Sequence, residues 1–202
     1  MKKEFLGLLA TALFLITCKS QTTENEIATV TDIHPDKVVL SDGNIIQTPP
    51  MAVNEETTLY IVRHGEKTNA ADPQKEFTAE LNSNGQQRAA KLETLFKKTI
   101  LGAVLAIPSR YAMQTGELVA KQQRVELYNY NFTDYGALLD YIYKEEKGKK
   151  YLVVGRAESI PDLLNLLTAG QKFPAIPDGV YDDMFVVVTK QRGDAKVWHV
   201  KY

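Results

Sequence analysis

The chain has 202 residues, of which 44% are hydrophobic, and its 24 Lys and Arg residues nearly balance its 25 Asp and Glu residues. This apolar fraction is typical of a globular protein and excludes a disordered acidic chain, while the near-neutral charge disfavours a broad nucleic-acid-binding surface. With only three His and one Cys, the chain cannot assemble a disulfide framework or a cysteine-rich zinc site. We therefore expect neither a metal nor a nucleic acid as partner, and any chemistry must use very little imidazole.

The N-terminus combines a basic start with an uninterrupted apolar run over residues 5–17. This run is too short for a transmembrane helix, which needs about 20 apolar residues, and it is typical of a secretory signal peptide. The end of the run, the tetrapeptide LITC that finishes at Cys18, resembles a bacterial lipoprotein signal. The resemblance implies cleavage after residues 1–17, lipidation of Cys18, and an exported protein anchored by lipid to the membrane of the bacterial cell envelope. A plain signal peptide in which Cys18 has no role is the alternative.

Residues 18–56 are expected to form a tether and a small β-hairpin. Residues 19–26 are polar and predict a flexible tether. Two short apolar segments, 38–40 and 45–46, flank the sequence Ser-Asp-Gly-Asn at 41–44. Because Asp-Gly between apolar segments is a strong turn signal, these segments predict an antiparallel hairpin.

From residue 57 to residue 202, short apolar segments alternate with segments of helical periodicity. The pattern predicts strands at 58–62, 103–107, 125–128, 151–154, 184–189 and 196–200, and helices at 86–98, at 113–121, around Leu138 and Ile142, and after a capping Ser159. Strands that alternate with helices predict an α/β fold, here a three-layer sandwich around a mostly parallel sheet. A segment of this length buries one core, so residues 57–202 are expected to be a single domain.

Three of the predicted strands end in a loop that carries an arginine. Arg63 and His64 follow the first of these strands, Arg110 follows the second and Arg156 follows the third. Ligands of open α/β sheets bind outside the carboxyl ends of the strands, and neighbouring strands lie about 4.8 Å apart, so these loops can converge. Three guanidinium groups and one imidazole near helix N-termini favour a phosphate site. The alternative is that each arginine is a solvated partner of a nearby glutamate.

The segment LYIVRHGEK at residues 59–67 resembles the opening motif of the histidine phosphatase superfamily, also called the phosphoglycerate mutase-like family. Residues 81–92 (LNSNGQQRAAKL), 114–117 (QTGE) and 152–155 (LVVG) resemble later segments of that family in the same order. The resemblance extends over residues 57–202 and implies the histidine phosphatase fold and a phosphorylated ligand. No Walker-type glycine-rich loop is present, and we expect no cofactor.

The resemblance also implies roles for individual residues. In the family, the first histidine takes up the phosphoryl group, and the motif arginine, a second arginine and a second histidine hold the phosphoryl oxygens. Carried over by motif, His64 is the nucleophile and Arg63 binds the phosphoryl group. The second arginine is expected where this chain has Tyr111, next to Arg110, and the second histidine is expected where it has Arg156.

These departures bear on catalysis. Arg156 keeps a positive charge but cannot exchange a proton at neutral pH, so we expect phosphate binding to persist and turnover to be impaired. The acid that protonates the leaving group cannot be assigned by motif, and the carboxylates nearest in sequence are Glu66 and Glu158. His64 must be neutral to attack, and nearby guanidinium groups disfavour its protonation.

Two functions stay open on this evidence. One is a phosphohydrolase that works through phospho-His64, with Arg156 in place of the second histidine and with phosphate or a phosphorylated small molecule as ligand. The other is a pseudophosphatase that binds a phosphorylated ligand or an envelope partner without turnover. The aromatic residues of 128–135 either line a substrate rim or pack on the core, and His34 and His199 are expected at the surface.

Overall fold

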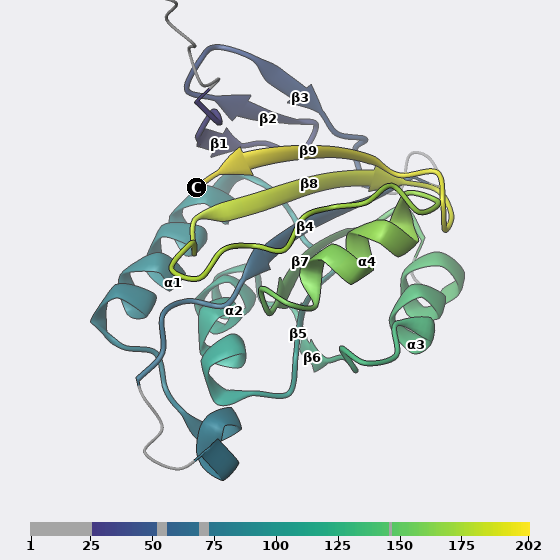
Figure 1. Cartoon of the computed structure of the whole chain (residues 1–202). Helices are drawn as coiled ribbons and strands as arrows, with labels where there is room; N and C mark the ends of the chain where they lie inside the picture. The colour runs from purple at the N-terminus through teal and green to yellow at the C-terminus, as the bar shows by residue number, and fades with distance from the viewer. Residues whose placement is uncertain (1–25, 52–55, 69–72, 146) are drawn as a thin grey trace, which may run out of the picture.

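The computed structural model of the protein describes residues 26–51, 56–68, 73–145 and 147–202 (Figure 1). The predicted signal peptide, Cys18 and the predicted tether up to residue 25 lie outside the described residues. Within the described part of the chain, none of the helices combines the length and the hydropathy of a membrane-spanning segment.

The core is a six-stranded sheet in the order β6–β5–β7–β4–β8–β9. Its strands are β4 (Thr57–Arg63), β5 (Ala103–Ala106), β6 (Leu127–Asn129), β7 (Lys150–Gly155), β8 (Asp183–Thr189) and β9 (Lys196–Lys201). Strands β6, β5, β7 and β4 run parallel to one another. Strand β8 pairs antiparallel with β4, and β9 pairs antiparallel with β8. Every residue of β4, β7 and β8 is buried, as expected of strands covered on both faces. The predicted mostly parallel sheet is confirmed, with an antiparallel pair at one edge.

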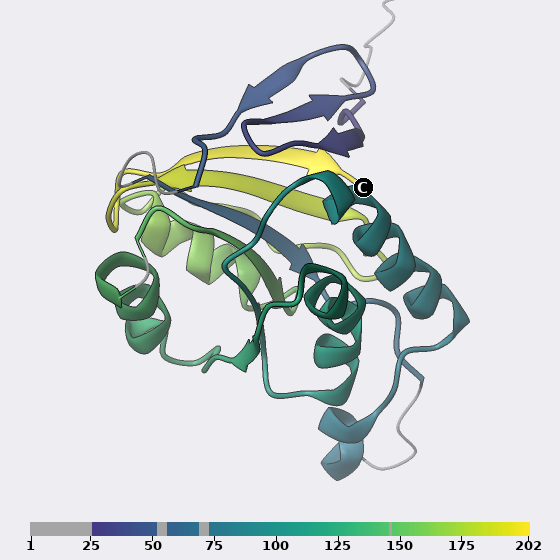
Figure 2. The ribbon, with the colours of Figure 1, turned by 180° about the vertical axis from the view of Figure 1, so that it is seen from behind.

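Helices cover both faces of the sheet. They are α1 (Ser83–Leu95), α2 (Arg110–Gln123), α3 (Gly136–Asp140) and α4 (Ile160–Leu167), together with the 3-10 segments η1 (Pro73–Thr78) and η2 (Phe96–Lys98) and the π-helical turn η3 (Tyr141–Glu145). Figures 1 and 2 show α1 and α2 together on one face and α4 on the other, which gives the predicted three layers.

The first two helices begin earlier than the periodicity predicts because side chains cap them. Asn82 accepts hydrogen bonds from the backbone N–H groups of Asn84 and Gly85, which starts α1 at Ser83. Ser109 accepts from the N–H of Ala112 and starts α2 in the same way. Ser159 precedes α4 at the predicted cap position, but its side chain makes no capping hydrogen bond to the helix, so the predicted cap is wrong.

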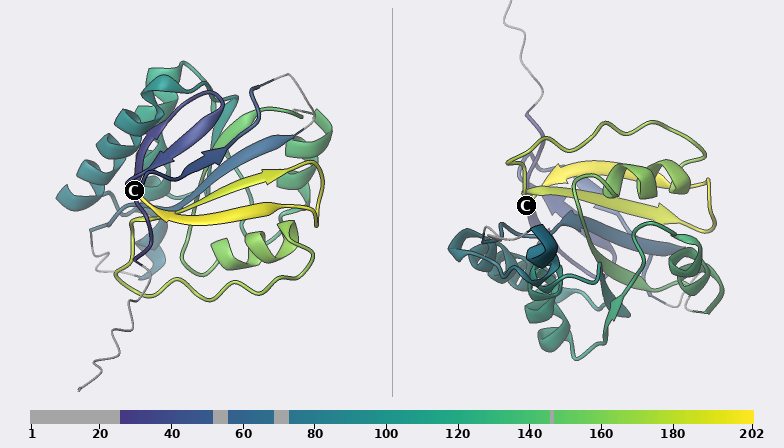
Figure 3. Two further views of the ribbon diagram at one scale, coloured as in Figure 1. Left: turned by 90° about the horizontal axis from the view of Figure 1, so that it is seen from above. Right: turned by 60° about the horizontal axis from the view of Figure 1, so that its bottom comes forward.

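A small antiparallel sheet precedes the domain and consists of β1 (Val30–Ile33), β2 (Lys37–Leu40) and β3 (Ile45–Gln47). The turn predicted at 41–44 connects β2 and β3, and the sequence pattern missed β1. The sheet lies against the β9 edge, where Lys201 N–H donates to the Ala28 carbonyl, and near the end of α1, where Lys98 pairs with Asp32 (Figure 3).

Candidate functional site

The ends of β4 and β7 bring the predicted site residues together. Arg63 lies opposite Gly155 in the parallel ladder, and the N–H of His64 donates to the Gly155 carbonyl at 2.9 Å. Strand β5 pairs with the other side of β7, with Ala106 opposite Val154. The three arginine-bearing loops therefore leave neighbouring strands at one edge of the sheet, as predicted, and His64 is adjacent to the loop that begins with Arg156.

His64 is a buried, neutral imidazole. Its Nδ1 lies 2.8 Å from the carbonyl oxygen of Gly65, and because a carbonyl only accepts, Nδ1 carries the proton and Nε2 keeps its lone pair. Nε2 forms no hydrogen bond within the described residues. Burial lowers the pKa of His64 to about 4, the bond to Gly65 opposes this, and the positive charges of Arg63, Lys67 and Arg156 lower it further. At neutral pH His64 therefore offers an unprotonated nitrogen.

The backbone around His64 is held by close packing on α1 and α2. The N–H of Gly65 donates to Thr115 Oγ1 at 2.9 Å, and that hydroxyl donates to the Tyr111 carbonyl at 2.8 Å. A Cβ at Gly85 would lie 2.2 Å from the Glu66 carbonyl oxygen, and a Cβ at Gly65 would lie 3.0 Å from Gly85 Cα. Only glycine fits at this contact, so the start of α1 fixes the loop that carries the nucleophile.

Arg63 is bound by the segment 177–181. Its Nη1 donates to the carbonyls of Val180 at 2.9 Å and Pro177 at 3.3 Å, and its guanidinium lies 4.0 Å from the ring centroid of Tyr181. Its buried Nε makes no hydrogen bond within the described part of the chain. Since a guanidinium has five N–H donors, Arg63 retains donors for an anion while this segment orients it.

Arg156, which the resemblance places at the position of the second histidine, contacts carboxylates and phenyl rings. Its Nε lies 3.3 Å from Glu158 Oε2 and its Nη2 lies 3.9 Å from Glu76 Oε1. Its Cζ lies 5.5 Å from the ring centroid of Phe132 and 5.8 Å from that of Phe77. The Ser159 hydroxyl accepts a hydrogen bond from the Arg156 N–H at 3.1 Å. Ser159, which the sequence predicted to cap the next helix, therefore holds the backbone of the Arg156 loop.

The pair Lys67 and Glu76 is a part of the site that the sequence analysis missed. Lys67 Nζ lies 2.9 Å from Glu76 Oε1 and 5.0 Å from the ring centroid of Tyr111. The hydrogen bond from Lys67 is the main reason why the pKa of Glu76 is below its ordinary value. The only sequence signal was the position of Lys67 as the last residue of the motif at 59–67.

The structure does not bring Arg110 to His64, contrary to its predicted role in phosphate binding. The Arg110 side chain is 61% exposed, and its Nε lies 3.4 Å from Glu80 Oε1. Tyr111, the next residue, is fully buried, with its ring centroid 4.3 Å from that of His64. Consecutive residues of a helix face different directions, so only one of the two can point inward. The Tyr111 hydroxyl has no hydrogen-bond partner within the described residues.

The two glutamates considered as the acid both have a pKa held below its ordinary value by neighbouring groups. Arg88 binds both carboxylate oxygens of Glu66, at 3.0 and 2.6 Å, and this bond holds the pKa of Glu66 below its ordinary value. Partial desolvation acts to raise the pKa of Glu158, but its backbone amide and the positive charges of Arg156 and Arg63 lower it overall. Both carboxylates are therefore ionised at neutral pH, and the assignment of either one as the acid stays a prediction.

The remaining aromatic and histidine residues divide between core and surface. Tyr130 and Tyr135 are buried, whereas Phe132 reaches Arg156, so residues 128–135 both pack on the core and line the site. His34 lies 3.2 Å from Asp32, and His199 is exposed on β9. Among the described residues, no group of three or more His, Cys, Asp or Glu could hold a metal ion.

Comparison with known proteins indicates one family. The model of the histidine phosphatase superfamily (branch 1) matches residues 59–131. The protein histidine phosphatase SixA complexed with tungstate shares 20% identity and a TM-score of 0.59, over 71% of this chain and 96% of that one. Phosphoglycerate mutase from Bacillus anthracis str. Sterne shares 18% identity and a TM-score of 0.57, over 72% and 93% of the two chains.

A mycobacterial glucosyl-3-phosphoglycerate phosphatase shares 11% identity and a TM-score of 0.52, over 72% of this chain and 100% of that one. No curated protein matches the sequence significantly. The family model and the shared fold together confirm the resemblance read from the motifs: the chain has the fold of the histidine phosphatase superfamily and matches its branch 1 model across the His64 motif.

Proposed function

We propose that the protein binds phosphate or a phosphorylated small molecule at the carboxyl ends of β4 and β7, and that His64 takes up the phosphoryl group with slow turnover. The observation that carries the proposal is a neutral His64 with a free Nε2, next to the three cations Arg63, Lys67 and Arg156. A phosphoryl-transfer site needs a positioned nucleophile and positive charge around the transferring oxygens.

The proposed reaction has two steps. Nε2 of His64 attacks phosphorus in line, the bond from phosphorus to the leaving group breaks, and phospho-His64 forms. Water then attacks phosphorus, the phosphorus–nitrogen bond breaks, and inorganic phosphate is released. The bond from Nδ1–H to the Gly65 carbonyl stabilises the positive imidazole ring of the intermediate. The guanidinium of Arg63 offers its free Nε–H to the phosphoryl oxygens.

Slow turnover follows because none of the three glutamates described near His64 is a neutral carboxylic acid at neutral pH. Arg156 is a permanent cation, and the pKa values of Glu66, Glu76 and Glu158 are all lowered, so these carboxylates are ionised at neutral pH. The leaving group must then depart without help from an acid. Aryl phosphates and phosphoramidates tolerate this better than alkyl phosphates do. SixA, a protein histidine phosphatase by its name, is a structural neighbour, and this supports a substrate with a phosphorus–nitrogen bond.

The test is direct detection of phospho-His64. The protein is incubated with labelled phosphoramidate, and acid-labile, alkali-stable phosphate is located by mass spectrometry of peptides. We expect label on His64 and none in His64→Ala, while His199→Ala, with its exposed histidine on β9, labels like wild type. Absence of label on wild-type His64 contradicts the proposal, and rapid turnover of an alkyl phosphate contradicts its slow-turnover part.

A second candidate function is phosphate binding without transfer, as in a pseudophosphatase. Two observations favour it: the carbonyls of Pro177 and Val180 already hold Arg63, and the buried ring of Tyr111 stands where the family has an arginine. Phosphate binding without label on His64 would select this function over the first.

Export and lipid anchoring are a separate proposal, supported by the apolar run over 5–17 and the single cysteine after it. We expect labelled palmitate to enter the protein in bacterial cells and to be absent from Cys18→Ser. Equal labelling of the two proteins would overturn the anchor at Cys18.

A further inference from the structure

The site as built from motifs has one cation too few. The family's second arginine is replaced by Tyr111, and the neighbouring Arg110 pairs with Glu80 at the surface. A phosphate dianion bound at His64 would therefore meet Arg63 and Arg156 alone. Because arginines and lysines supply most of the binding energy for phosphate oxygens, another cation at the position of the lost one would restore the balance.

Lys67 lies beside Tyr111, the residue at the position of the lost arginine. Its ammonium group is 5.0 Å from the ring centroid of Tyr111, whose ring is itself 4.3 Å from that of His64. The charge of Lys67 acts on His64 together with those of Arg63 and Arg156. The Lys67 side chain is 26% exposed, so it is partly withdrawn from water while its ammonium can still meet a ligand.

One oxygen of Glu76 bridges two of the three cations. Oε1 of Glu76 lies 2.9 Å from Lys67 Nζ and 3.9 Å from Arg156 Nη2. An anion that touches a lysine and an arginine beside His64 is what a phosphoryl oxygen would be in a complex. A phosphate dianion carries more charge and more acceptor oxygens than one carboxylate, so it can displace Glu76 from both cations.

We propose that Lys67 is the second phosphate-binding cation of the His64 site, and that the Glu76 carboxylate occupies the place between Lys67 and Arg156 until a phosphate displaces it. This inference rests on the proposed function, because it assumes that phosphate binds at His64. It assigns to η1, which carries Glu76, the role of an internal competitor for the ligand.

The test is the affinity for inorganic phosphate, measured by titration calorimetry at neutral pH and low salt. We expect Lys67→Met to weaken binding about 10-fold or more and Lys67→Arg to stay within about 3-fold of wild type. We expect Glu76→Gln to bind phosphate about 3-fold or more tightly, because the competing charge is gone while the side chain keeps its shape. A merely structural ion pair would weaken or leave unchanged the binding in Glu76→Gln.

The matched control is the ion pair of Lys121 and Glu117 on α2, whose Nζ and Oε1 are 2.7 Å apart. Lys121→Met and Glu117→Gln are expected to bind phosphate like wild type. Unchanged affinity in Lys67→Met or no gain in Glu76→Gln overturns the inference. If phosphate binding depends on Lys67 but His64 takes up no label, the inference stands and only the proposed phosphoryl transfer is contradicted. If the wild-type protein binds no phosphate, both the inference and the proposed function are contradicted.

Discussion

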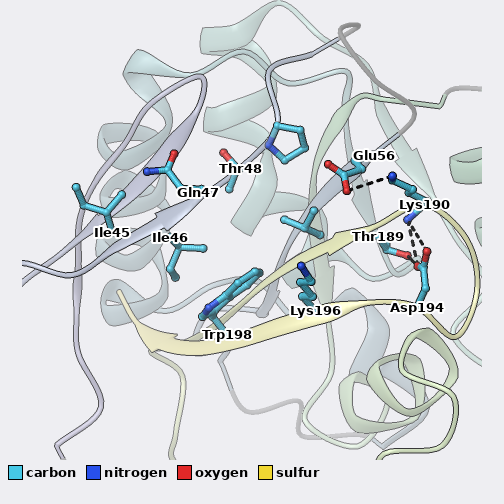
Figure 4. A pocket seen from close by; sticks show the side chains of 12 residues that line it. Ile45, Ile46, Gln47, Thr48, Glu56, Thr189, Lys190, Asp194, Lys196 and Trp198 are labelled. Atoms are coloured by element: carbon cyan, nitrogen blue, oxygen red, sulfur yellow. Dashed lines mark hydrogen bonds and ion pairs between the residues drawn. The ribbon is translucent and has the colours of Figure 1, made fainter.

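The two ends of β4 differ in how exposed to solvent the polar groups beside them are. At its carboxyl end, Arg63 leads into the His64 site. At its amino end, Thr57 lies opposite Thr189, next to a cleft of about 730 Å³ between β3 and the β8–β9 pair. Figure 4 shows the side chains that line this cleft, among them Trp198 and Lys190.

The charged groups at the amino-end cleft form ion pairs that are exposed to solvent. Lys190 Nζ lies 3.7 Å from Glu56 Oε1, and the Lys190 side chain is 60% exposed. The N–H of Lys190 donates to Asp194 Oδ1 at 3.1 Å, as Figure 4 shows. Exposed pairs of this kind are screened by water, so they neither shift a pKa strongly nor hold a ligand tightly.

The carboxyl end has the opposite character. His64 is 4% exposed and has an unused Nε2, and three cations surround it. The proposed site thus lies away from the 730 Å³ cleft, and burial rather than cavity size distinguishes it. The carboxyl end also has ion pairs, but they lie beside a buried imidazole, and burial together with the nearby positive charges lowers the pKa of His64.

The largest effect should come from Gly85→Ala, which would break the carboxyl end selectively. The new Cβ would lie 2.2 Å from the Glu66 carbonyl oxygen, and backbone cannot move aside as a side chain does. We expect a loss of about 3 kcal/mol in the free energy of unfolding, more than the helix-propensity gain of about 1 kcal/mol, together with loss of phosphate binding. Urea unfolding and phosphate titration measure both.

Gly102→Ala is the control for this substitution. Its Cβ would meet Lys149 Cδ at 2.8 Å, and a lysine side chain can move away. We expect the free energy of unfolding to change by less than about 1 kcal/mol. Equal losses in the two variants would show that the contact between Gly85 and Glu66 is not special.

The second prediction concerns the pH dependence of stability. His64 has a pKa of about 4 in the fold, against about 6.5 when unfolded. Below pH 6.5 the unfolded chain therefore binds a proton that the folded protein refuses, so stability falls as the pH drops from 6.5 towards 4. We expect the stability difference between wild type and His64→Gln to shift by about 2–3 kcal/mol, against wild type, between pH 7 and pH 4.5.

Urea unfolding of both proteins at these two pH values measures the shift, and taking the difference removes the contribution of the carboxylates. The same comparison between pH 7 and pH 8 should show no shift, since His64 is neutral in both states there. A constant difference down to pH 4.5 would mean that His64 is not desolvated as the structure shows.

The third prediction exchanges the unusual arginine. We expect Arg156→His to raise kcat towards an alkyl phosphate about 10-fold, because an imidazole can transfer a proton at neutral pH and a guanidinium cannot. Phosphate affinity should fall, since a permanent cation is lost. Arg156→Asn, which like a neutral histidine lacks the permanent charge but has no group that exchanges a proton, should not raise kcat; if it does, proton transfer is not what limits turnover.

The strands that position the site could be predicted from the sequence, whereas the orientation of individual side chains could not. The strand that ends in Arg63 and His64 could be read from its apolar run and motif, and the neighbouring position of Arg156 follows from the parallel order of β4 and β7. The inward side chain at the start of α2 could not be read, because the periodicity placed the helix start at 113. With the helix beginning at Arg110, after its cap at Ser109, Tyr111 rather than Arg110 faces His64.

The long-range partners were out of reach of sequence patterns. Lys67 meets Glu76 only because η1 folds back on the motif loop. The carbonyls that hold Arg63 belong to Pro177 and Val180, more than a hundred residues away in the chain, and backbone oxygens leave no signature in a sequence. Both sets of contacts depend on packing rather than on local pattern.

The smallest effect is expected for Lys190→Met at the amino-end cleft, which makes the same substitution as Lys67→Met at the other end of β4. Each lysine pairs with one glutamate oxygen, at 3.7 Å for Lys190 and 2.9 Å for Lys67. The exposed pair should contribute less than about 0.5 kcal/mol to the free energy of unfolding, and its loss should leave phosphate affinity unchanged. Thermal unfolding and phosphate titration of the two variants side by side test whether position, and not the loss of a lysine, decides the effect. If Lys190→Met weakens phosphate binding as much as Lys67→Met does, a general loss of positive charge explains both, and the contrast between the two ends of β4 fails.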